Sequence, residues 1–373
     1  MMSIRLVADD LTGALDAAVQ FTALDRGLTV LLDGHSGAAS PSSAAISTNS
    51  RDLDGSAAAA RMAGAAAFLG GAGLRFLKID SLLRGHWPEA IAMALRAGPD
   101  QLCVFAPAFP DQQRIMRGGR QYAPRADGAL VPLERDADRE LARVGLRMAR
   151  IPAGIAPDAD IPAAPGSVLV CDALGQDDLN RLVAAAQRVG PPILWCGSAG
   201  LARALAGRAP PVIVPQPARR LVIVGSNHRV TYGQVAAVPA SSAARIPLTD
   251  DAEQSALRVA ASLEHGNCIV TPGLPDDITA QAAAPVIEAR LRATLPRLAK
   301  PQAVVVIGGE TLDAACKAVG ANALHPHGEI MPGVPVSRVV GGAWNGIDLI
   351  SRSGAFGAPD FLARLLAPGG RAA

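Results

Sequence analysis

The 373-residue chain has few aromatic residues and almost no net charge. Aromatic side chains make up 3% of the sequence, and 35 Lys and Arg residues are balanced by 33 Asp and Glu residues, which gives a formal net charge of +2. A protein that binds nucleic acid usually needs a basic surface and aromatic side chains on which bases stack. The composition therefore argues against nucleic acid as a partner.

Several motifs of well-known enzyme classes are missing as well. The chain has only three lysines, Lys78, Lys300 and Lys317, and since none follows a glycine, the G-x-x-x-x-G-K-[ST] phosphate loop is absent. No G-x-G-x-x-G follows an expected strand, and no H-E-x-x-H, paired C-x-x-C or G-x-S-x-G motif occurs. These absences exclude a P-loop NTPase and argue against an NAD-dependent oxidoreductase, a zinc enzyme and an α/β-hydrolase.

The cysteines are odd in number, and no long apolar run occurs. The cysteines show no C-x-x-C spacing and mostly lie in apolar segments such as Leu102–Phe105, so we expect buried free thiols. No apolar run approaches the ~20 residues of a membrane-spanning helix, and Asp9 and Asp10 lie where a signal peptide needs its apolar stretch. We therefore expect a cytoplasmic protein with no membrane partner. The cysteines are Cys103, Cys171, Cys196, Cys268 and Cys316.

Short aliphatic runs alternate with helical stretches along the whole chain. This alternation is typical of strand–helix units, so we predict an α/β fold with mostly parallel sheets flanked by helices. The clearest helix begins at the Asp9–Thr12 turn, where Leu11, Leu15 and Ala18 share one face. The expected strands are Ile4–Ala8, Leu28–Leu32, Ala44–Thr48, Leu74–Ile79, Gln101–Ala106, Val168–Cys171 and Ile193–Cys196, and then Leu221–Val224, Ala244–Pro247, Cys268–Thr271, Ala303–Ile307, Val336–Val340 and Ile347–Ser351.

The chain is longer than one hydrophobic core usually serves, which indicates two domains. The segment 209–217 is rich in proline, which suits neither a helix nor a central strand. A new strand is expected directly after it. We therefore predict a first domain over residues 1–208, a linker over 209–219 and a second domain over 220–373.

The segment Ala8–Gly13 follows the first expected strand and opens a helix. Open α/β sheets bind ligands at the carboxyl ends of their strands, so Asp9 and Asp10 are candidates for a general base or a metal ligand, with Thr12 beside them. A capping role, in which an aspartate accepts bonds from helix N–H groups, explains either aspartate alone equally well. Because neighbouring side chains diverge, one aspartate could cap while the other faces the cleft.

Two further strand ends carry polar side chains in the same half of the chain. One turn combines a lysine, a carboxylate, a hydroxyl and an arginine, which suits an anionic substrate. At the other, Arg51 could hold a carboxylate in a two-point fork, with Ser50 beside it. Helix caps and solvated arginines are the alternative explanation for both. The first turn is formed by Lys78, Asp80, Ser81 and Arg84.

The stretch between Phe109 and Glu134 is rich in Gly, Pro, Gln and Arg and has little periodicity. It predicts a long loop with a hairpin, inserted between regular units, and such loops are often functional. Arg114 is one of its clustered cations. A basic loop without a function is the competing explanation.

In the second half, three expected strands end in glycine-containing turns. Backbone N–H groups in such turns bind phosphates, although glycine also ends strands for steric reasons alone. Three such turns in one domain favour a phosphate site. They lie at Gly225–His228, Gly308–Thr311 and Ser353–Gly357.

These segments together resemble the four-carbon acid sugar kinase family, formerly a domain family of unknown function. The match runs collinearly from near Ile4 to Phe361, and no single segment would suffice for it. The segments that carry it are Ala8–Ala14, Lys78–Gly85, Pro107–Pro110 with Arg114, Gly308–Thr311 and Ser353–Gly357.

The resemblance implies ATP-dependent phosphorylation of a threonate, an erythronate or an oxo-tetronate at its terminal hydroxyl, with Mg²⁺ bridging the phosphates. It implies that residues 1–208 bind the small anionic sugar acid, that residues 220–373 bind ATP, and that the active site lies in the interdomain cleft. A homodimer is compatible with it. The stereoisomer and the identity of the base stay open.

The same resemblance assigns residues to the two sides of the site. Catalysis is assigned to Asp9, Asp10 and Asp80 jointly. The other residues expected to bind the sugar acid are Thr12, Ser50, Arg51, Lys78, Ser81, Arg84 and Arg114. The residues expected to bind the nucleotide are Ser226, Gly308, Gly309, Glu310, Thr311, Arg352, Ser353 and Gly354.

The chain departs from the family pattern at a few positions. Arg352 stands where lysine is usual, and because a guanidinium is a planar fork, its expected phosphate contact needs a different geometry. Leu82 replaces a usual threonine, His86 a common asparagine and Gln113 a usual glycine. These departures leave open an alternative, in which the chain is a non-catalytic sensor of a sugar acid or a nucleotide with the same fold.

Overall fold

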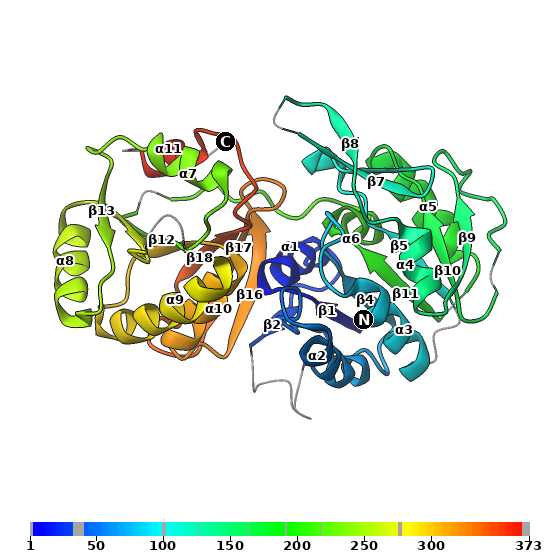
Figure 1. Ribbon diagram of the computed structural model, residues 1–373, viewed down its shortest axis with the longest axis horizontal. Helices are drawn as coiled ribbons and strands as arrows, with labels where there is room; N and C mark the ends of the chain where they lie inside the picture. The colour runs from blue at the N-terminus through cyan, green and yellow to red at the C-terminus, as the bar shows by residue number, and fades with distance from the viewer. Residues whose placement is uncertain are drawn as a thin grey trace. The chain divides into compact units, whose positions relative to one another are not determined.

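The computed structural model describes residues 3–32, 41–98, 102–125, 127–162, 164–190, 192–216, 218–274 and 278–367. The chain is an α/β protein that divides into two compact units (Figure 1). The first unit contains the described residues up to Val30 and from residue 41 to Pro210, and the second contains Leu31, Leu32 and those from Pro211 onward. No helix among the described residues is long and apolar enough to cross a membrane.

The first unit is built on a parallel sheet with the strand order β3-β1-β4-β11-β5-β10-β9. Strands β4, β5, β10 and β11 are buried along their whole length. Strands buried in this way are mostly apolar because helices cover both faces of the sheet, and the charged exceptions are Arg75 and Lys78 of β4. The strands are β1 (Ile4–Ala8), β3 (Ala44–Ser47), β4 (Leu74–Lys78), β5 (Leu102–Ala106), β9 (Arg147–Ile151), β10 (Ser167–Cys171) and β11 (Ile193–Gly197), with the short β2 (Thr29–Leu31) before β3.

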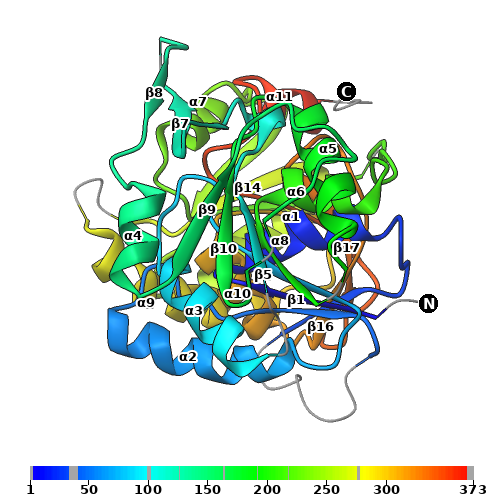
Figure 2. The ribbon, with the colours of Figure 1, turned by 90° about the vertical axis from the view of Figure 1, so that its right-hand side faces the viewer.

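Helices pack on both faces of this sheet (Figure 2). One face carries α1 (Leu11–Phe21), α5 (Gln176–Gln187) and α6 (Ala199–Ala206), and the other carries α2 (Gly55–Phe68) and α3 (Trp87–Ala97). Helix α4 (Ala137–Arg143) packs on β9. The sequence predicts one apolar stripe for α1, but all 11 of its residues are buried. Helix α6 packs against α1, in addition to the strands β1, β3 and β4 on which α1 lies.

The predicted loop and hairpin between Phe109 and Glu134 is confirmed and contains one strand more. A short 3₁₀ helix, η1 (Pro110–Gln112), leads into an antiparallel sheet of β6 (Ile115–Arg117), β7 (Arg120–Pro124) and β8 (Leu130–Pro132). An isolated bridge between Met116 and Ala173 ties this insertion to the segment that follows β10.

The sheet of the second unit has the order β13-β14-β12-β15-β18-β17-β16. The first five strands are parallel, whereas β17 runs antiparallel to both of its neighbours. The prediction of mostly parallel sheets is therefore confirmed, with β17 as the antiparallel strand of this unit. The strands are β12 (Arg220–Val224), β13 (Ala243–Pro247), β14 (Asn267–Thr271), β15 (Ala303–Ile307), β16 (Ala323–Glu329), β17 (Pro335–Val340) and β18 (Asp348–Arg352).

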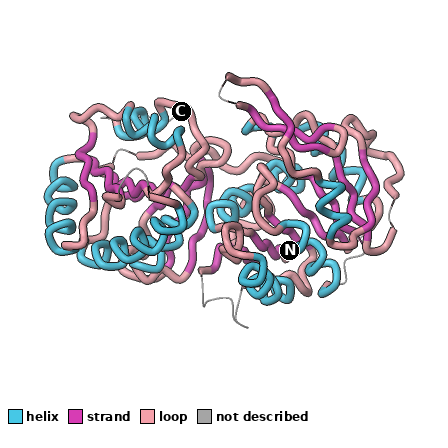
Figure 3. The backbone as a smooth tube through the Cα atoms, viewed as in Figure 1, coloured by secondary structure: helices cyan, strands magenta, loops and turns pink. Residues whose placement is uncertain are grey.

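Helices also flank the sheet of the second unit (Figure 3). Helix α7 (Arg229–Ala236) packs against α11 (Phe361–Leu366), and α9 (Ala280–Thr294) packs against both α8 (Ala252–His265) and α10 (Gly309–Ala318). A 3₁₀ turn, η2 (Leu295–Arg297), follows α9. Residues of α11, including Phe361 and Leu365, share one hydrophobic core with Val222, Val305 and Ile350 of the sheet.

Every strand expected from the sequence is present, with each described end within one residue of its predicted position. Strands β9 and β16 were not predicted. The prediction of buried free thiols is confirmed, since all five cysteines are buried and unpaired.

Candidate active site

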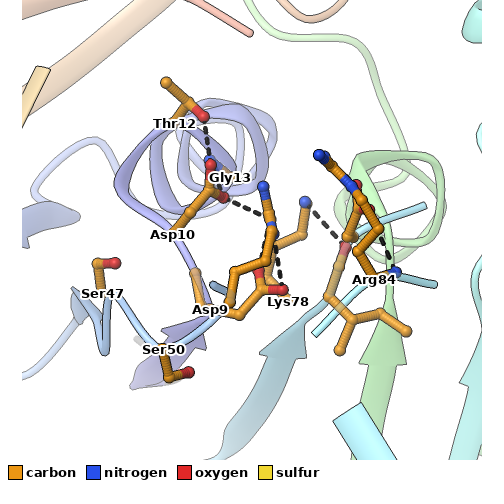
Figure 4. A network of polar contacts seen from close by, with 12 residues as sticks. Asp9, Asp10, Thr12, Gly13, Ser47, Ser50, Lys78 and Arg84 are labelled. Carbon is orange, nitrogen blue, oxygen red and sulfur yellow. Dashed lines mark hydrogen bonds and ion pairs between the residues drawn. The ribbon is translucent and has the colours of Figure 1, made fainter. Parts of the chain in front are cut away.

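Asp9 and Asp10 connect β1 to α1, and the structure gives them different partners (Figure 4). Asp10 is the N-cap of α1: its Oδ1 accepts a hydrogen bond from the Gly13 N–H at 2.8 Å, and its Oδ2 accepts one from the Thr12 hydroxyl at 2.5 Å. Asp9 instead binds Arg51 through both carboxylate oxygens, with Nε–Oδ2 3.0 Å and Nη2–Oδ1 2.6 Å. The expectation that one aspartate caps and the other does not is met, with Asp10 as the cap.

Arg51 joins the two aspartates. Its Nη2 also lies 2.7 Å from Asp10 Oδ1, and the three side chains are only 11–15% exposed. Arg51 reaches this place because the backbone N–H groups of Ser50 and Arg51 donate to the Asp9 carbonyl at 3.0 and 3.3 Å, which holds the end of β3 beside the end of β1. The Ser50 hydroxyl bonds to Thr48 at 2.7 Å and does not contact the Asp9–Arg51 pair.

The two aspartates also differ in pKa. Burial raises the pKa of Asp9 above its ordinary value despite the neighbouring Arg51 charge. Burial acts on Asp10 too, but the charges of Arg51 and Lys78 and the Thr12 hydrogen bond outweigh it, so the pKa of Asp10 is lowered. Of the two, Asp9 is therefore the more basic carboxylate.

The turn after β4 supplies a third carboxylate. Asp80 binds Arg84, with Nε–Oδ2 2.5 Å, and its pKa is lowered well below the usual range because the charges of Arg51 and Arg84 outweigh its burial. The Arg84 side chain is 55% exposed, in contrast to Asp80 at 7%. This turn touches the Asp9–Arg51 pair, because a Cβ placed on Gly85 would lie 3.4 Å from Asp9 Oδ2 and from the Arg51 Cα.

Lys78 and the inserted hairpin complete the cluster. The Lys78 side chain is buried, its Nζ donates to the Ile79 carbonyl at 3.0 Å, and a Cβ on Gly13 would lie 3.1 Å from that nitrogen. Arg114 is buried as well and donates from Nη1 to the Ser81 hydroxyl at 2.5 Å. The insertion therefore holds a cation beside the Asp80 turn.

Backbone strain is concentrated around this cluster. Among the described residues, the non-glycine residues with positive φ are Asn49 (46°), Leu83 (57°) and Gln113 (53°). Each directly precedes a predicted site residue, namely Ser50, Arg84 or Arg114. Left-handed backbone at such residues is costly and is found preferentially at functional sites.

Asp16 is a member of this region that the sequence analysis missed. It lies on α1 one turn after Thr12 and Gly13, is 5% exposed, and its Oδ1 has no hydrogen-bond partner among the described residues. Burial raises its pKa to about 6, an effect that the nearby Lys78 charge only partly offsets. The available signal was a carboxylate four residues after Thr12, on the same face of an otherwise apolar helix.

The second unit brings its three glycine-containing turns together, because β12, β15 and β18 are neighbours in the sheet. A Cβ on Gly225 would lie 2.0 Å from the Thr311 hydroxyl oxygen, and one on Gly354 would lie 1.9 Å from the Ser226 hydroxyl oxygen. Gly308 is the N-cap of α10, with a φ of 111° that favours glycine. The start of this helix, where Glu310 is exposed, is suited to bind a phosphate.

Arg352 lies at the end of β18 but is fully buried, at 1% exposure. Its Nη1 donates to the carbonyls of Ser353 and Phe356, both at 2.9 Å, and its Nη2 donates to Gln234 Oε1. Burial lowers its pKa to about 10. In this structure its bonds go to groups of the protein itself.

Comparisons with known proteins match both units. A sugar-binding N-terminal domain family matches residues 4–205, and a nucleotide-binding C-terminal domain family matches residues 221–362. A D-threonate kinase of Cupriavidus necator is 32% identical over 90% of each chain. A 3-oxo-tetronate kinase of Methylobacterium radiotolerans is 30% identical and covers 98% of this chain and 99% of its own.

A solved structure shares the fold. A crystal structure of a protein from Salmonella typhimurium LT2 has a TM-score of 0.71 at 21% identity and covers 97% of this chain and 98% of its own. A Bordetella bronchiseptica protein, solved with bound citrate as a domain-swapped dimer, is 28% identical, covers 96% of each chain and has a TM-score of 0.45.

Proposed function

The chain belongs to the four-carbon acid sugar kinase family and is an ATP-dependent kinase of four-carbon sugar acids, and from this premise we propose that it phosphorylates D-threonate at the terminal hydroxyl. The substrate choice is supported by the 32% identity to the Cupriavidus necator D-threonate kinase. The observation that carries the site assignment is the buried Asp9–Arg51–Asp10 cluster at the carboxyl ends of β1 and β3.

Asp9 is proposed as the base that accepts the proton of the attacking hydroxyl. Its pKa is raised, whereas that of Asp10 is lowered and its oxygens are engaged in capping α1. Asp80 is paired with Arg84 and also has a lowered pKa. A base needs a pKa near the working pH, which favours Asp9 over both.

Arg84 and Lys78 are proposed to bind the carboxylate of the sugar acid. Arg51 already uses its Nε and Nη2 groups on Asp9 and Asp10, so only its Nη1 group remains for a substrate. The Arg84 side chain is 55% exposed, whereas the Arg51 side chain is 11% exposed. Ser81 and Arg114 lie beside it and would line the same side, together with Thr12 and Ser50 as the sequence predicts.

The nucleotide phosphates are proposed to bind to the glycine-containing turns of the second unit. The segment Gly308–Thr311 forms the N-cap and first turn of α10, Ser226 lies beside Gly308, and Gly354 packs against Ser226. Arg352 and Ser353 belong to the same predicted set.

Mg²⁺ belongs to this proposal as the ion that would neutralise charge on the phosphates. No group of three or more metal-ligating side chains occurs in the described part of the chain. Mg²⁺ usually takes one or two carboxylates, phosphate oxygens and water, and the exposed Glu310 in the first turn of α10 fits that set.

The reaction itself requires the two ligands to meet. Phosphoryl transfer needs the hydroxyl in line with the γ-phosphate, so we place the reacting complex in an interdomain cleft, with residues 1–208 and 220–373 as its two sides and 209–219 as the linker. A cytoplasmic location is proposed with it, since ATP is the phosphate donor.

ADP release by the purified protein, in the presence of Mg·ATP, tests the substrate assignment. The panel should contain D-threonate, D-erythronate and 3-oxo-tetronate. We expect the highest kcat/KM with D-threonate. A higher kcat/KM with either of the other acids would overturn the choice of D-threonate and leave the kinase class intact.

A further inference from the structure

We propose that Arg352 is a positioning residue for the nucleotide site, which fixes the carbonyl groups of the 353–358 turn so that N–H groups of this turn face the phosphates. The inference rests on the proposed nucleotide site and assigns Arg352 a role different from the direct phosphate contact expected from the sequence.

Three buried side chains bind the carbonyls of the 353–358 turn. Arg352 Nη1 donates to Ser353 O and Phe356 O, both at 2.9 Å. Thr231 Oγ1 donates to Gly354 O at 2.8 Å. The Gln234 amide donates to Phe356 O at 3.2 Å and to Ala358 O at 2.8 Å.

Arg352 and Gln234 also bind each other, and Gln234 shares helix α7 with Thr231. Arg352 Nη2 donates to Gln234 Oε1, so the arginine and the glutamine orient each other. Thr231 and Gln234 lie three residues apart on one face of α7, and both are fully buried. The guanidinium carbon lies 6.0 Å from the centre of the Phe361 ring.

The burial of Arg352 without a carboxylate partner needs an explanation. No ion pair of Arg352 occurs among the residues that the structure describes, and its Nε has no hydrogen-bond partner there. A buried cation is costly unless its donors are used. Here Nη1 binds two carbonyls of one turn and Nη2 binds Gln234, which itself binds that turn, so fixing the turn is the function that the contacts support.

The direction of the carbonyls determines the direction of the N–H groups. A trans peptide group points its C=O and the following N–H in opposite directions. The carbonyls of residues 353, 354 and 356 point towards Arg352, Thr231 and Gln234, so the N–H groups of residues 354, 355 and 357 point away from them. Successive outward N–H groups in a turn form a binding site for an anion.

This turn lies beside the other proposed phosphate contacts. Gly354 packs against Ser226, where a Cβ would approach the hydroxyl oxygen to 1.9 Å. Gly308, which begins α10, lies close to the same serine, with 3.6 Å from its Cβ position to the Ser226 Cβ. The N–H groups of the 353–358 turn are thus placed to bind the same phosphates as the start of α10.

Calorimetric titration with ADP and with adenosine tests the inference in the full-length protein. Arg352→Met keeps the length of the side chain and removes its donors, and Gln234→Met removes the second set of bonds to the turn. We expect each variant to weaken ADP binding about tenfold and to leave adenosine binding unchanged. The double variant should bind ADP as tightly as the single variant with the lower affinity, since both side chains act through one turn. The KM for the sugar acid should change less than twofold, and Arg352→Lys should restore part of the ADP affinity.

Several outcomes would overturn the inference. If Gln234→Met left ADP affinity unchanged while Arg352→Met lowered it, Arg352 would contact the phosphate directly. Additive losses in the double variant would lead to the same conclusion. If Arg352→Met does not fold, Gln234→Met and Thr231→Val carry the test, because neither side chain is expected to reach the phosphates.

Two controls separate this inference from the proposed function. Arg258→Met removes an exposed arginine of α8 and should leave ADP affinity unchanged. If the unmodified protein bound no ADP, the proposed nucleotide site itself would fail. If it bound ADP and Arg352→Met bound it equally well, only the positioning role would fail.

Discussion

Arg51 and Asp9 form a two-point ion pair, with Nε–Oδ2 3.0 Å and Nη2–Oδ1 2.6 Å, although 42 positions separate them in the sequence. The pair forms because β3 lies beside β1 in parallel register, with Ser47 opposite Ala8. Arg51 also binds Asp10, so one guanidinium neutralises two carboxylates that follow each other in the chain. It therefore permits both aspartates to be ionised within one buried site.

Removing this guanidinium should destabilise the protein. Arg51→Met leaves Asp9 and Asp10 buried without their cation, and breaking a buried ion pair in this way typically costs about 3 kcal/mol or more. We expect a loss of that size in the free energy of unfolding, measured by urea denaturation, together with loss of kinase activity. Arg143→Met is the matched control, because Arg143 pairs with Glu89 at the surface and is 54% exposed, where such a pair contributes about 1 kcal/mol or less. Equal losses in the free energy of unfolding for the two variants would contradict the assignment of Arg51 as the cation that stabilises the buried Asp9 and Asp10.

Asp9 and Asp10 should respond differently to the same substitution. Asp9→Asn removes the proposed base and is expected to lower kcat by about 10²-fold or more. Asp10→Asn should lower kcat much less, because asparagine is an effective N-cap and still accepts the bond from the Gly13 N–H. Steady-state kinetics with D-threonate and ATP would show the difference. If Asp10→Asn lost as much kcat as Asp9→Asn at equal stability, the base would have to be reassigned.

The sequence predicts strands and strand ends well because aliphatic runs and glycine turns report local backbone structure. It misses β9 and β16 for identifiable reasons. Strand β9 lies at the edge of its sheet and exposes Arg147 and Arg150, so its apolar pattern is weak. Strand β16 contains Pro326 and an irregular register between Pro326 and Gly328.

The partners of the site residues are harder to predict than the residues themselves. Arg51 reaches Asp9 and Asp10 because β3 lies beside β1 in the sheet, and no spacing in the sequence reports that order of strands. Arg352 precedes a glycine turn and therefore resembles a phosphate ligand. Its partner Gln234 lies 118 positions away on α7, so only the folded structure shows that the Nη1 and Nη2 groups of Arg352 bind the protein itself.

Close packing of the glycine turns gives a test of the nucleotide site. Gly354→Ala should weaken ADP binding about tenfold, because the new methyl group would lie 1.9 Å from the Ser226 hydroxyl oxygen and must displace it. Adding Ser226→Gly should relieve the collision and restore part of the affinity. Gly233→Ala is the control, since a Cβ there meets nothing within 4 Å on α7. It should leave ADP binding unchanged and stabilise the helix by about 0.5–1 kcal/mol. Unchanged ADP affinity in Gly354→Ala would remove this turn from the site.

Asp16 should make the stability of the protein depend on pH. Its pKa is raised from 3.8 to about 6, chiefly by burial, so the folded state binds the proton more tightly than the unfolded state does. The resulting stability is fully present below pH 3.8 and is lost as the pH rises through about 6. Asp16→Asn cannot ionise and escapes this loss. Relative to the unmodified protein, its free energy of unfolding should therefore rise by about 3 kcal/mol between acidic and neutral pH.

Urea denaturation of both proteins across this pH range measures the effect, and Asp54→Asn provides a control of opposite sign. The pKa of Asp54 is lowered by hydrogen bonds from the backbone of Ala57 and from Ser56. Its ionised form therefore stabilises the folded state above the ordinary carboxyl pKa, and this stability is lost as the pH falls. Asp54→Asn should accordingly lose stability, relative to the unmodified protein, as the pH rises, while Asp16→Asn gains it. A difference for Asp16→Asn that stays constant with pH would show that Asp16 does not carry a raised pKa.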